Sequence, residues 1–274
     1  MQFLKVHGAG NDFILLPDLQ DAHPLTSGVV RALCRPHLGL GADGVIRVAP
    51  PRKHVHADVF MDYWNADGEV AEMCGNGVRC VAKYLADRDP AGGDVVTVDT
   101  RAGVKTVHVS RDAHGRVERA RVDMGPPLVG KVDEPLEVDG DTVRITTLSM
   151  GNPHAVLMVD DVASVPLADI GAGIGGHEAF PEGSNVEVVQ IMDRRTLRGR
   201  IWERGVGETM ASGTGAAAMA VAAAVLGMAE RQVTATLPGG DLDIDWTDAT
   251  LWVTGPAVEV ATGNLDETWL TSIR

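Results

Sequence analysis

Alternating hydrophobic and polar positions run through most of the chain and predict a structure dominated by β-strands. Turns rich in Gly, Asp and Pro separate the alternating segments, as is typical of strands joined by short connections. The clearest segments lie at His56–Tyr63, Val95–Asp99, Val104–Val109, Arg116–Met124, Thr142–Leu148, Val186–Met192 and Leu251–Thr254. Because strands dominate and do not alternate regularly with helices, the pattern favours an α+β fold over a β-α-β arrangement.

Helical patterns are fewer, and the two longest have the same kind of beginning. Thr26 is a favourable N-cap for a helix running to about His37, and a shorter helix is expected near Asp161–Ile170. The longer helices are predicted over Gly75–Arg88 and Gly213–Leu226, and each begins with Gly-x-Gly. The pattern therefore predicts one long helix in each half of the chain.

These two helices belong to a local sequence that occurs twice. Residues Tyr63–Gly77 read YWNADGEVAEMCGNG, and residues Ile201–Gly215 read IWERGVGETMASGTG. In register, the matched residues are Trp64 and Trp202, Gly75 and Gly213, and Gly77 and Gly215. One position differs in its chemistry, because Cys74 falls on Ser212.

A second matched pair extends the repeat. Gly10-Asn11 near the N-terminus corresponds to Gly151-Asn152, 141 residues later, and Cys74 and Ser212 are 138 residues apart. Two matched elements at nearly the same offset indicate a duplicated domain. We predict an N-terminal domain over residues 1–115, completed by residues 262–274, and a C-terminal domain over residues 116–261.

Charge and cysteine content narrow the class of protein. The 274 residues carry a formal net charge of −14, which argues against nucleic acid or an anionic membrane as a partner. The one basic cluster is interpreted as a solvated strand edge and comprises Arg194, Arg195, Arg198 and Arg200.

No run approaches ~18 apolar residues, so no membrane span is expected. The first residues lack the pattern of a signal peptide. Three cysteines without framework spacing favour a reducing, cytoplasmic location.

The start of a helix is a place where a cysteine can become reactive. Free N–H groups and the positive end of the helix dipole favour an anion there, and glycines let it approach the backbone. Cys74 would then have a pKa below the ~8.5 of a free thiol and could act as a base or nucleophile. The alternative is a small buried hydrophobe, which is the interpretation we favour for Cys34 and Cys80.

Ser212 has two interpretations. It could be only an N-cap, since serine is favoured at that position. It could also be a nucleophile, which would require a base, and His154 and His7 are candidates by position alone. Two Gly-x-Gly-x-x-Gly matches, at residues 39–44 and 171–176, lack the strand-to-helix context of a dinucleotide site. An oxidoreductase is therefore the weakest hypothesis, and no metal-ligand spacing stands out.

Polar residues beside the repeated segments suit an amino acid ligand. They are Asn11, Asn65, Asn152, Asn185, Glu203 and Arg204. Asparagine amides both donate and accept hydrogen bonds, a glutamate can bind an ammonium group, and an arginine can bind a carboxylate in bidentate fashion. Each residue alone could equally be a turn residue or part of a surface ion pair.

Several motifs, in order, resemble those of the diaminopimelate epimerase family of pyridoxal-independent amino acid racemases. They are HGAGNDF at 7–13, NADG at 65–68, MCGNGVRC at 73–80, GNPH at 151–154, SNVE at 184–187, ERGVGET at 203–209 and GTGA at 213–216. The resemblance implies two pseudo-symmetric domains, each with a β-sheet wrapped around a central helix.

The resemblance also implies epimerisation of LL-diaminopimelate to meso-diaminopimelate, a step toward lysine and peptidoglycan, without a cofactor. One thiolate removes the α-proton, and a second thiol returns a proton from the opposite face. Cys74 is then one acid–base residue. The substrate α-carboxylate would bind the backbone N–H groups of Gly75, Asn76, Gly213 and Thr214. The rest of the substrate would bind Asn11, Asn65, Asn152, Asn185, Glu203 and Arg204. A homodimer is compatible with this hypothesis.

The departure from the family pattern is Ser212, which stands where the second catalytic cysteine belongs. A hydroxyl is a far weaker acid than a thiol, so we expect a rate loss of ~10²–10⁴. Two accounts remain: a Cys→Ser form of an ordinary epimerase, or a natural one-thiol homologue with altered chemistry such as α-proton exchange or elimination. We favour the first because the surrounding motifs keep the family pattern. The other hypotheses are a racemase or dehydratase of another small amino acid, and a non-catalytic amino acid-binding homologue.

Overall fold

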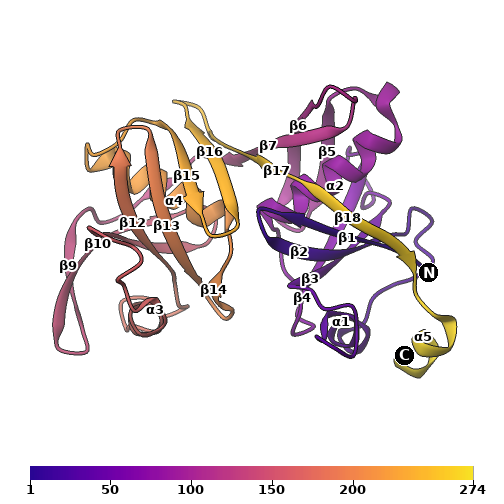
Figure 1. Cartoon of the computed structure of the whole chain (residues 1–274), viewed down its shortest axis with the longest axis horizontal. Helices are drawn as coiled ribbons and strands as arrows, with labels where there is room; N and C mark the ends of the chain where they lie inside the picture. The colour runs from indigo at the N-terminus through magenta and orange to yellow at the C-terminus, as the bar shows by residue number, and fades with distance from the viewer. Residues whose placement is uncertain (274) are drawn as a thin grey trace. The chain divides into compact units, whose positions relative to one another are not determined.

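A computed structural model describes residues 1–273 and divides the chain into two compact units (Figure 1). Unit 1 comprises Met1–Val122 and the chain from Gly255 onward, and unit 2 comprises Asp123–Thr254. The joins predicted from the sequence, after residues 115 and 261, differ from these by seven residues each. The last residue of the predicted segment 262–274 lies outside the described residues.

Strand pairing explains where the units divide. Both changes of unit occur inside a strand, β7 (Val117–Gly125) and β17 (Leu251–Pro256). Val122 is the last β7 residue paired with β6 (Gly103–Arg111), and Thr254 is the last β17 residue paired with β16 (Gly240–Trp246). The turn residues after Arg111 therefore lie within a hairpin of unit 1 and do not mark its end.

The two units contain corresponding elements in the same order. The remaining elements of unit 1 are β1 (Gln2–Gly8), β2 (Asn11–Pro17), α1 (Ser27–Cys34), β3 (Gly44–Ala49), β4 (Val59–Asn65), α2 (Gly75–Arg88), the 3-10 turn η1 (Pro90–Gly92), β5 (Val95–Thr100), β18 (Val258–Asn264) and α5 (Glu267–Ile273). Those of unit 2 are β8 (Leu128–Val129), β9 (Glu134–Val138), β10 (Asp141–Ser149), β11 (Pro153–Met158), α3 (Leu167–Gly175), β12 (Asn185–Asp193), β13 (Thr196–Glu203), β14 (Gly207–Thr209), α4 (Gly213–Val225) and β15 (Gln232–Leu237).

Strand directions repeat between the units. In unit 1, β2 runs parallel to β3 and β4 parallel to β5, whereas β1–β2, β3–β4 and β5–β6 are antiparallel. In unit 2, β11 runs parallel to β12 and β13 parallel to β15, whereas β10–β11, β12–β13 and β15–β16 are antiparallel. The same sequence of pairings in both units confirms the predicted pseudo-symmetric α+β fold.

Helices α2 and α4 are the central helices around which the sheets wrap (Figure 1). Helix α2 contacts β1, β2, β4, β5, β6 and β18, and α4 contacts β10, β11, β12, β13, β15 and β16. The first turns of both helices are buried, and α4 is apolar around nearly its whole circumference, as expected of a helix enclosed by its own sheet. Both helices lie where the sequence predicted them.

Two shorter helices differ from the prediction because of prolines. Thr26 caps α1 as expected, but the helix ends at Cys34, before the predicted end at His37. Pro36 disfavours helical backbone at Arg35, which is extended. Helix α3 begins at Leu167, after Pro166, so the predicted helix near Asp161–Ile170 is displaced toward the C-terminus.

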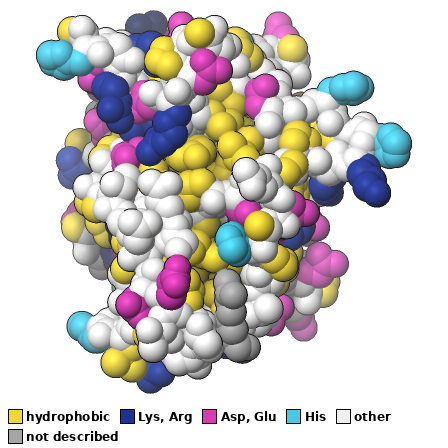
Figure 2. All heavy atoms as spheres, turned by 90° about the vertical axis from the view of Figure 1, so that its right-hand side faces the viewer, with side chains coloured by type: hydrophobic (Ala, Val, Ile, Leu, Met, Phe, Trp, Pro, Cys, Tyr) yellow, Lys and Arg dark blue, Asp and Glu magenta, His cyan; other side chains and the backbone are white. Residues whose placement is uncertain are grey.

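One face of unit 1 is notably apolar. Figure 2 shows hydrophobic side chains gathered across the middle of the face that lies on the right of Figure 1, with charged side chains around them. Strand β18 extends toward that side in Figure 1, and two of its residues, Val258 and Val260, are 37% and 61% exposed. The homodimer compatible with the sequence remains a prediction.

No helix within residues 1–273 combines the length and apolar character needed to cross a membrane.

Candidate active site

The two matched residues Cys74 and Ser212 occupy the same place at the start of α2 and α4. Both are N-cap residues with extended backbone, at φ −140° and ψ 118° for Cys74 and φ −130° and ψ 129° for Ser212. The first backbone bonds of the two helices run from Val78 N to Cys74 O and from Ala216 N to Ser212 O, both 2.9 Å. The backbone N–H groups before them have no carbonyl acceptor four residues earlier within the helix, which is the geometry of an anion-binding helix start.

Glycine in the first turn lets each helix lie directly on its sheet. A Cβ atom on Gly77 would come within 2.8 Å of Ile46 Cδ1, and a Cβ atom on Gly215 would come within 2.8 Å of Ile201 Cδ1. Such contacts are too short for any other residue without movement of the sheet side chains. The second glycine of each Gly-x-Gly therefore has a packing reason.

In unit 1, a chain of amide hydrogen bonds leads to the thiol. Cys74 Sγ donates to Asn11 Oδ1 at 3.7 Å, and Asn76 Nδ2 donates to the same oxygen at 3.1 Å. Asn11 Nδ2 in turn donates to Asp43 Oδ2 at 2.8 Å. Asp43 thus fixes the orientation of the Asn11 amide, so that its oxygen faces Cys74. Burial raises the pKa of Asp43, and the bonds from the Asp12 backbone N–H and the Asn11 amide oppose that shift.

Asn65 lies at the end of β4, beside this chain. Its side-chain oxygen accepts from Tyr63 Oη at 2.7 Å, and the next residue, Ala66, donates its backbone N–H to Asp43 O at 3.1 Å. The structure therefore brings Asn11, Asn76 and Cys74 together directly and places Asn65 next to them through the backbone of Asp43.

In unit 2, Ser212 performs a capping role that Cys74 does not. Ser212 Oγ accepts from Gly215 N at 3.3 Å and lies 3.3 Å from Thr214 Oγ1, whereas the Cys74 side chain makes no cap bond. The N-cap interpretation is confirmed. Neither histidine suggested as a base bonds to Ser212: His7 accepts from Gly10 N at 3.3 Å in the β1–β2 turn, and His154 has other partners.

His154 and Glu187 form a buried pair under the first turn of α4. His154 Nδ1 lies 2.7 Å from Glu187 Oε1, and both side chains are completely buried. A Cβ atom on Gly215 would lie 3.1 Å from Glu187 Oε1, which places the carboxyl directly beneath the helix. Burial raises the pKa of Glu187, and its second oxygen is buried without a hydrogen-bond partner.

The geometry of this pair defines its proton content. His154 Nε2 lies 3.0 Å from Asn152 Oδ1, which can only accept, so Nε2 must carry a hydrogen. One further proton is then shared between Nδ1 and Glu187 Oε1, because two acceptors cannot bond to each other. The pair is therefore neutral overall and holds the Asn152 oxygen inward, which directs its NH₂ group away from the pair.

The other predicted residues of unit 2 lie at neighbouring strand ends. Asn185 donates from Nδ2 to Pro153 O at 3.0 Å and accepts from Arg204 N at 2.9 Å, so it ties β11, β12 and the end of β13 together. Glu203 accepts from Thr209 Oγ1 at 2.7 Å. The Arg204 guanidinium is exposed and donates to Glu182 O at 2.8 Å, so it is not bonded to the start of α4.

Three charged residues of these networks were not identified from the sequence: Asp43, Arg79 and Glu187. Arg79 donates from Nη2 to Asn76 Oδ1 at 2.7 Å. Two of them carried a usable signal, because Arg79 lies between buried Val78 and Cys80, and Glu187 interrupts a hydrophobic strand. A charged residue inside a buried segment needs a partner, and that partner is a candidate site residue. Asp43 lies in a loop and offers no such signal.

Cys34 and Cys80 agree with the structural interpretation. Both are buried, and burial raises the pKa of each thiol to about 12. Both therefore remain protonated at neutral pH, which leaves Cys74 as the half-buried thiol at a helix start.

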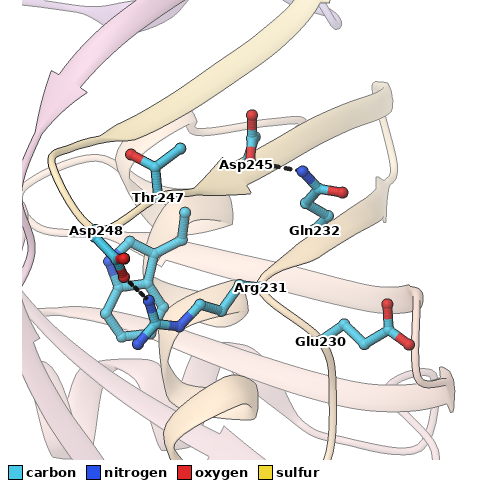
Figure 3. Close-up of a pocket in the computed structure, with 7 residues that line it drawn as sticks. Glu230, Arg231, Gln232, Asp245, Thr247 and Asp248 are labelled. Atoms are coloured by element: carbon cyan, nitrogen blue, oxygen red, sulfur yellow. Dashed lines mark hydrogen bonds and ion pairs between the residues drawn. The ribbon is translucent and has the colours of Figure 1, made fainter.

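A separate surface groove of about 470 Å³ lies in unit 2 (Figure 3) and is lined by Glu230, Arg231, Gln232, Asp245, Trp246, Thr247 and Asp248. Four of its polar side chains form two pairs with one another. Arg231 lies 2.8 Å from Asp248 and 4.5 Å from the Trp246 ring centre, and Gln232 lies 3.1 Å from Asp245. No residue predicted for the site lines this groove.

Comparison with known proteins identifies the family. The profile of the diaminopimelate epimerase family matches residues 3–129 and 146–266. The diaminopimelate epimerase of Moorella thermoacetica is 43% identical over 279 residues, covering 96% of this chain and 99% of that protein. That of Acetivibrio thermocellus is 40% identical, covering 97% and 99%. Diaminopimelate epimerase 1 of a Nostoc species is 42% identical, with the same coverage.

Solved structures agree at the level of the fold. A probable proline racemase from Agrobacterium radiobacter superimposes with a TM-score of 0.75 at 17% identity, covering 97% of this chain and 93% of that one. A hydroxyproline epimerase from Agrobacterium vitis gives a TM-score of 0.72 at 16% identity, covering 96% and 91%. With the family profile and relatives of more than 40% identity along nearly its whole length, this chain belongs to the diaminopimelate epimerase family of isomerases.

Proposed function

We propose that this chain epimerises LL-diaminopimelate to meso-diaminopimelate without pyridoxal phosphate, at a rate limited by Ser212. The observation that carries the proposal is the matched pair of helix starts, one with a thiol and the other with a hydroxyl. The substrate is supported by the relatives named diaminopimelate epimerase over the full length of the chain. A cytoplasmic place in lysine and peptidoglycan precursor synthesis is part of the same proposal.

In the proposed reaction, Cys74 acts as the base. The substrate α-carboxylate binds the N–H groups at the helix starts, at Gly75, Asn76, Gly213 and Thr214, and the positive dipole ends stabilise the carbanion that forms. The Cys74 thiolate takes the α-proton. Asn11 Oδ1 can accept a hydrogen bond from the S–H form only, so it stabilises Cys74 after the proton has been transferred.

Ser212 then has to return a proton to the α-carbon. Its oxygen accepts from Gly215 N and lies 3.3 Å from Thr214 Oγ1, and its own hydrogen is the proton that it would donate to the α-carbon. The limitation is acidity, because a hydroxyl gives up a proton far less readily than a thiol. Loss of one acid–base partner costs ~10²–10⁴ in rate, equivalent to about 3–5 kcal/mol of barrier.

The remaining polar residues are proposed to bind the rest of the substrate. Asn152 is suited to donate, since His154 occupies its oxygen. Glu203 suits the ammonium group, and Arg204 suits the distal carboxylate. Asn185 has both polar atoms engaged within unit 2, so we propose that it acts through the Arg204 backbone that it holds. Asn65 completes the set in unit 1.

Restoring the second thiol tests this proposal. The Ser212→Cys variant should convert LL- to meso-diaminopimelate ~10²–10⁴ times faster than the parent, without added pyridoxal phosphate. The matched control is Ser212→Cys combined with Cys74→Ala, which should show no such gain. A folded Ser212→Cys variant that turned over no diaminopimelate stereoisomer would contradict the substrate assignment.

A further inference from the structure

Arg79 is a completely buried arginine in the first turns of α2, at 0% exposure. Its guanidinium donates to three neutral oxygens: Asn76 Oδ1 at 2.7 Å, Pro256 O at 3.3 Å and Gly75 O at 3.4 Å. Within residues 1–273 it makes no ion pair with a carboxylate. A buried cation without an anion is unfavourable, so the fold keeps Arg79 charged at a cost that no acidic side chain offsets.

Neighbouring backbone makes room for this charge. Gly8 of β1 lies so close that a Cβ atom there would be 3.1 Å from Arg79 Nη2 and 3.1 Å from Asn76 O. The guanidinium is therefore held in one place, where it donates to the carbonyl of Gly75, the residue that directly follows Cys74. Hydrogen bonds continue from Arg79 to Asn76, from Asn76 to Asn11, and from Cys74 to the same Asn11 oxygen.

Among the ionisable groups around the start of α2, the Cys74 thiol is the one that can provide a negative charge for Arg79. Burial lowers the pKa of Arg79 to about 10, and negative charge on Cys80 or Cys74 would act in the opposite direction by favouring the charged form of Arg79. Cys80 remains neutral because burial raises its pKa to about 12. The other ionisable groups nearby are Arg119, Lys83, which pairs with Asp87, and Asp43, which accepts from Asn11.

The matched helix supports a role specific to the thiol. In the register that places Cys74 on Ser212, Arg79 falls on Ala217, which is fully buried in α4. The helix that begins with a hydroxyl thus has no internal cation, although its backbone start is the same. The arginine therefore occurs in the helix whose N-cap is a thiol and not in the helix whose N-cap is a hydroxyl.

We propose that Arg79 is a positioning residue, whose buried guanidinium is the fixed counter-ion of the Cys74 thiolate. Through Asn76 and Asn11 it also orients the acceptor that faces the thiol. This inference rests on the proposed function in one respect, the thiolate form of Cys74 as the base.

The test reads the thiol directly and requires no substrate. In the full chain, Arg79→Gln removes the charge and keeps an amide donor. It should slow iodoacetamide alkylation of Cys74 at pH 7, measured by peptide mass, by at least about tenfold, and should move the thiolate titration up by about 1–3 pH units. Arg79→Lys keeps the charge and should restore most of the rate.

Arg88→Gln is the matched control, because it removes an arginine from the same helix. Arg88 lies about 20 Å along the helix from Cys74, beyond the screening distance at physiological salt, so alkylation should be unchanged. Equal alkylation rates for the parent, Arg79→Gln and Arg79→Lys would overturn the inference. If Arg79→Gln does not fold, a Cys74 thiolate titration in the parent at or above ~8.5 would overturn it as well.

The two proposals can fail separately. An inactive Ser212→Cys variant together with a charge-dependent Cys74 reactivity would remove the substrate assignment and keep the role of Arg79. If Ser212→Cys turned over diaminopimelate fully but the reactivity of Cys74 did not depend on Arg79, the substrate assignment would stand and the role of Arg79 would be removed.

Discussion

The starts of α2 and α4 share a backbone and differ in nearly every polar contact behind it. Both have an extended N-cap, a Gly-x-Gly turn and a first helical bond of 2.9 Å. At α2 the side chain at the cap is a thiol that bonds to Asn11, and at α4 it is a hydroxyl that bonds to the helix itself. Duplication thus preserved the anion-binding backbone, while the side chains beneath it changed independently.

The difference extends into the sheets. Strand pairing places Phe13 and His154 at corresponding positions, and likewise Ile46 and Glu187, in each case 141 residues apart. Unit 1 therefore has apolar strands under a helix that contains Arg79, whereas unit 2 has a polar pair under an apolar helix. The matched asparagines Asn11 and Asn152 are consequently oriented from opposite sides, the first by a helix residue and a loop carboxylate, the second by a strand histidine.

Replacing the N-cap residues Cys74 and Ser212 should reveal the greatest difference between the two helix starts, which is their contribution to proton transfer. Cys74→Ala should reduce solvent deuterium exchange at the substrate α-carbon by ~10²–10⁴, because it removes the proposed base. Ser212→Ala should reduce exchange by less than about tenfold, because a hydroxyl contributes little as an acid at neutral pH. Mass spectrometry of recovered diaminopimelate measures both. Similar losses for the two variants would mean that the half-sites are chemically equivalent.

The buried pair of unit 2 provides the next largest effect. His154→Phe leaves Glu187 buried without its partner and should lower the free energy of unfolding by about 3–5 kcal/mol. Combining it with Glu187→Ile installs the side chains that unit 1 has at these positions. The double variant should unfold within about 1.5 kcal/mol of the parent. Urea unfolding compares them, and a double variant as unstable as the single one would refute this account.

The same pair should make stability depend on pH. Burial raises the folded-state pKa of Glu187 above its ordinary 4.5, so the folded protein keeps a proton that the unfolded chain releases. Its stabilising contribution is then complete below pH 4.5 and decreases as pH rises toward the folded-state pKa, by at most about 1.4 kcal/mol per pH unit. Relative to Glu187→Gln, the parent should lose stability as the pH rises above 4.5, by at most about 1.4 kcal/mol per pH unit, and urea unfolding at a series of pH values measures this loss. Parallel stability curves for the two proteins would argue against a raised pKa.

The smallest predicted difference between Cys74 and Ser212 is their contribution to the free energy of unfolding as N-cap residues. Ser212→Ala removes the bond to Gly215 N and should cost about 1 kcal/mol of unfolding free energy. Cys74→Ala removes no cap bond, so its cost should be clearly lower. Thermal or urea unfolding of the two variants without substrate makes the comparison. A larger loss from Cys74→Ala would show that the thiol carries a structural role absent from its hydrogen bonds.

Features that depend on neighbouring residues could be predicted from the sequence. Strand alternation, the cap at Thr26 and the two Gly-x-Gly helix starts are local, and each formed where it was predicted. The repeat also identified Cys74 and Ser212 as matched positions. Even the error at the end of α1 was local, since the effect of Pro36 on Arg35 can be read from two adjacent residues.

The hydrogen bonds between distant polar groups could not be predicted in this way. Asn11 bonds to Asp43 across 32 positions of the chain, His154 bonds to Glu187 across 33, and Arg79 bonds to Pro256 across 177. Those contacts follow from the pairing and packing of distant strands, which local periodicity does not specify. The same holds for the division inside β7 and β17, where partner strands, and not turn residues, set the limits of each unit.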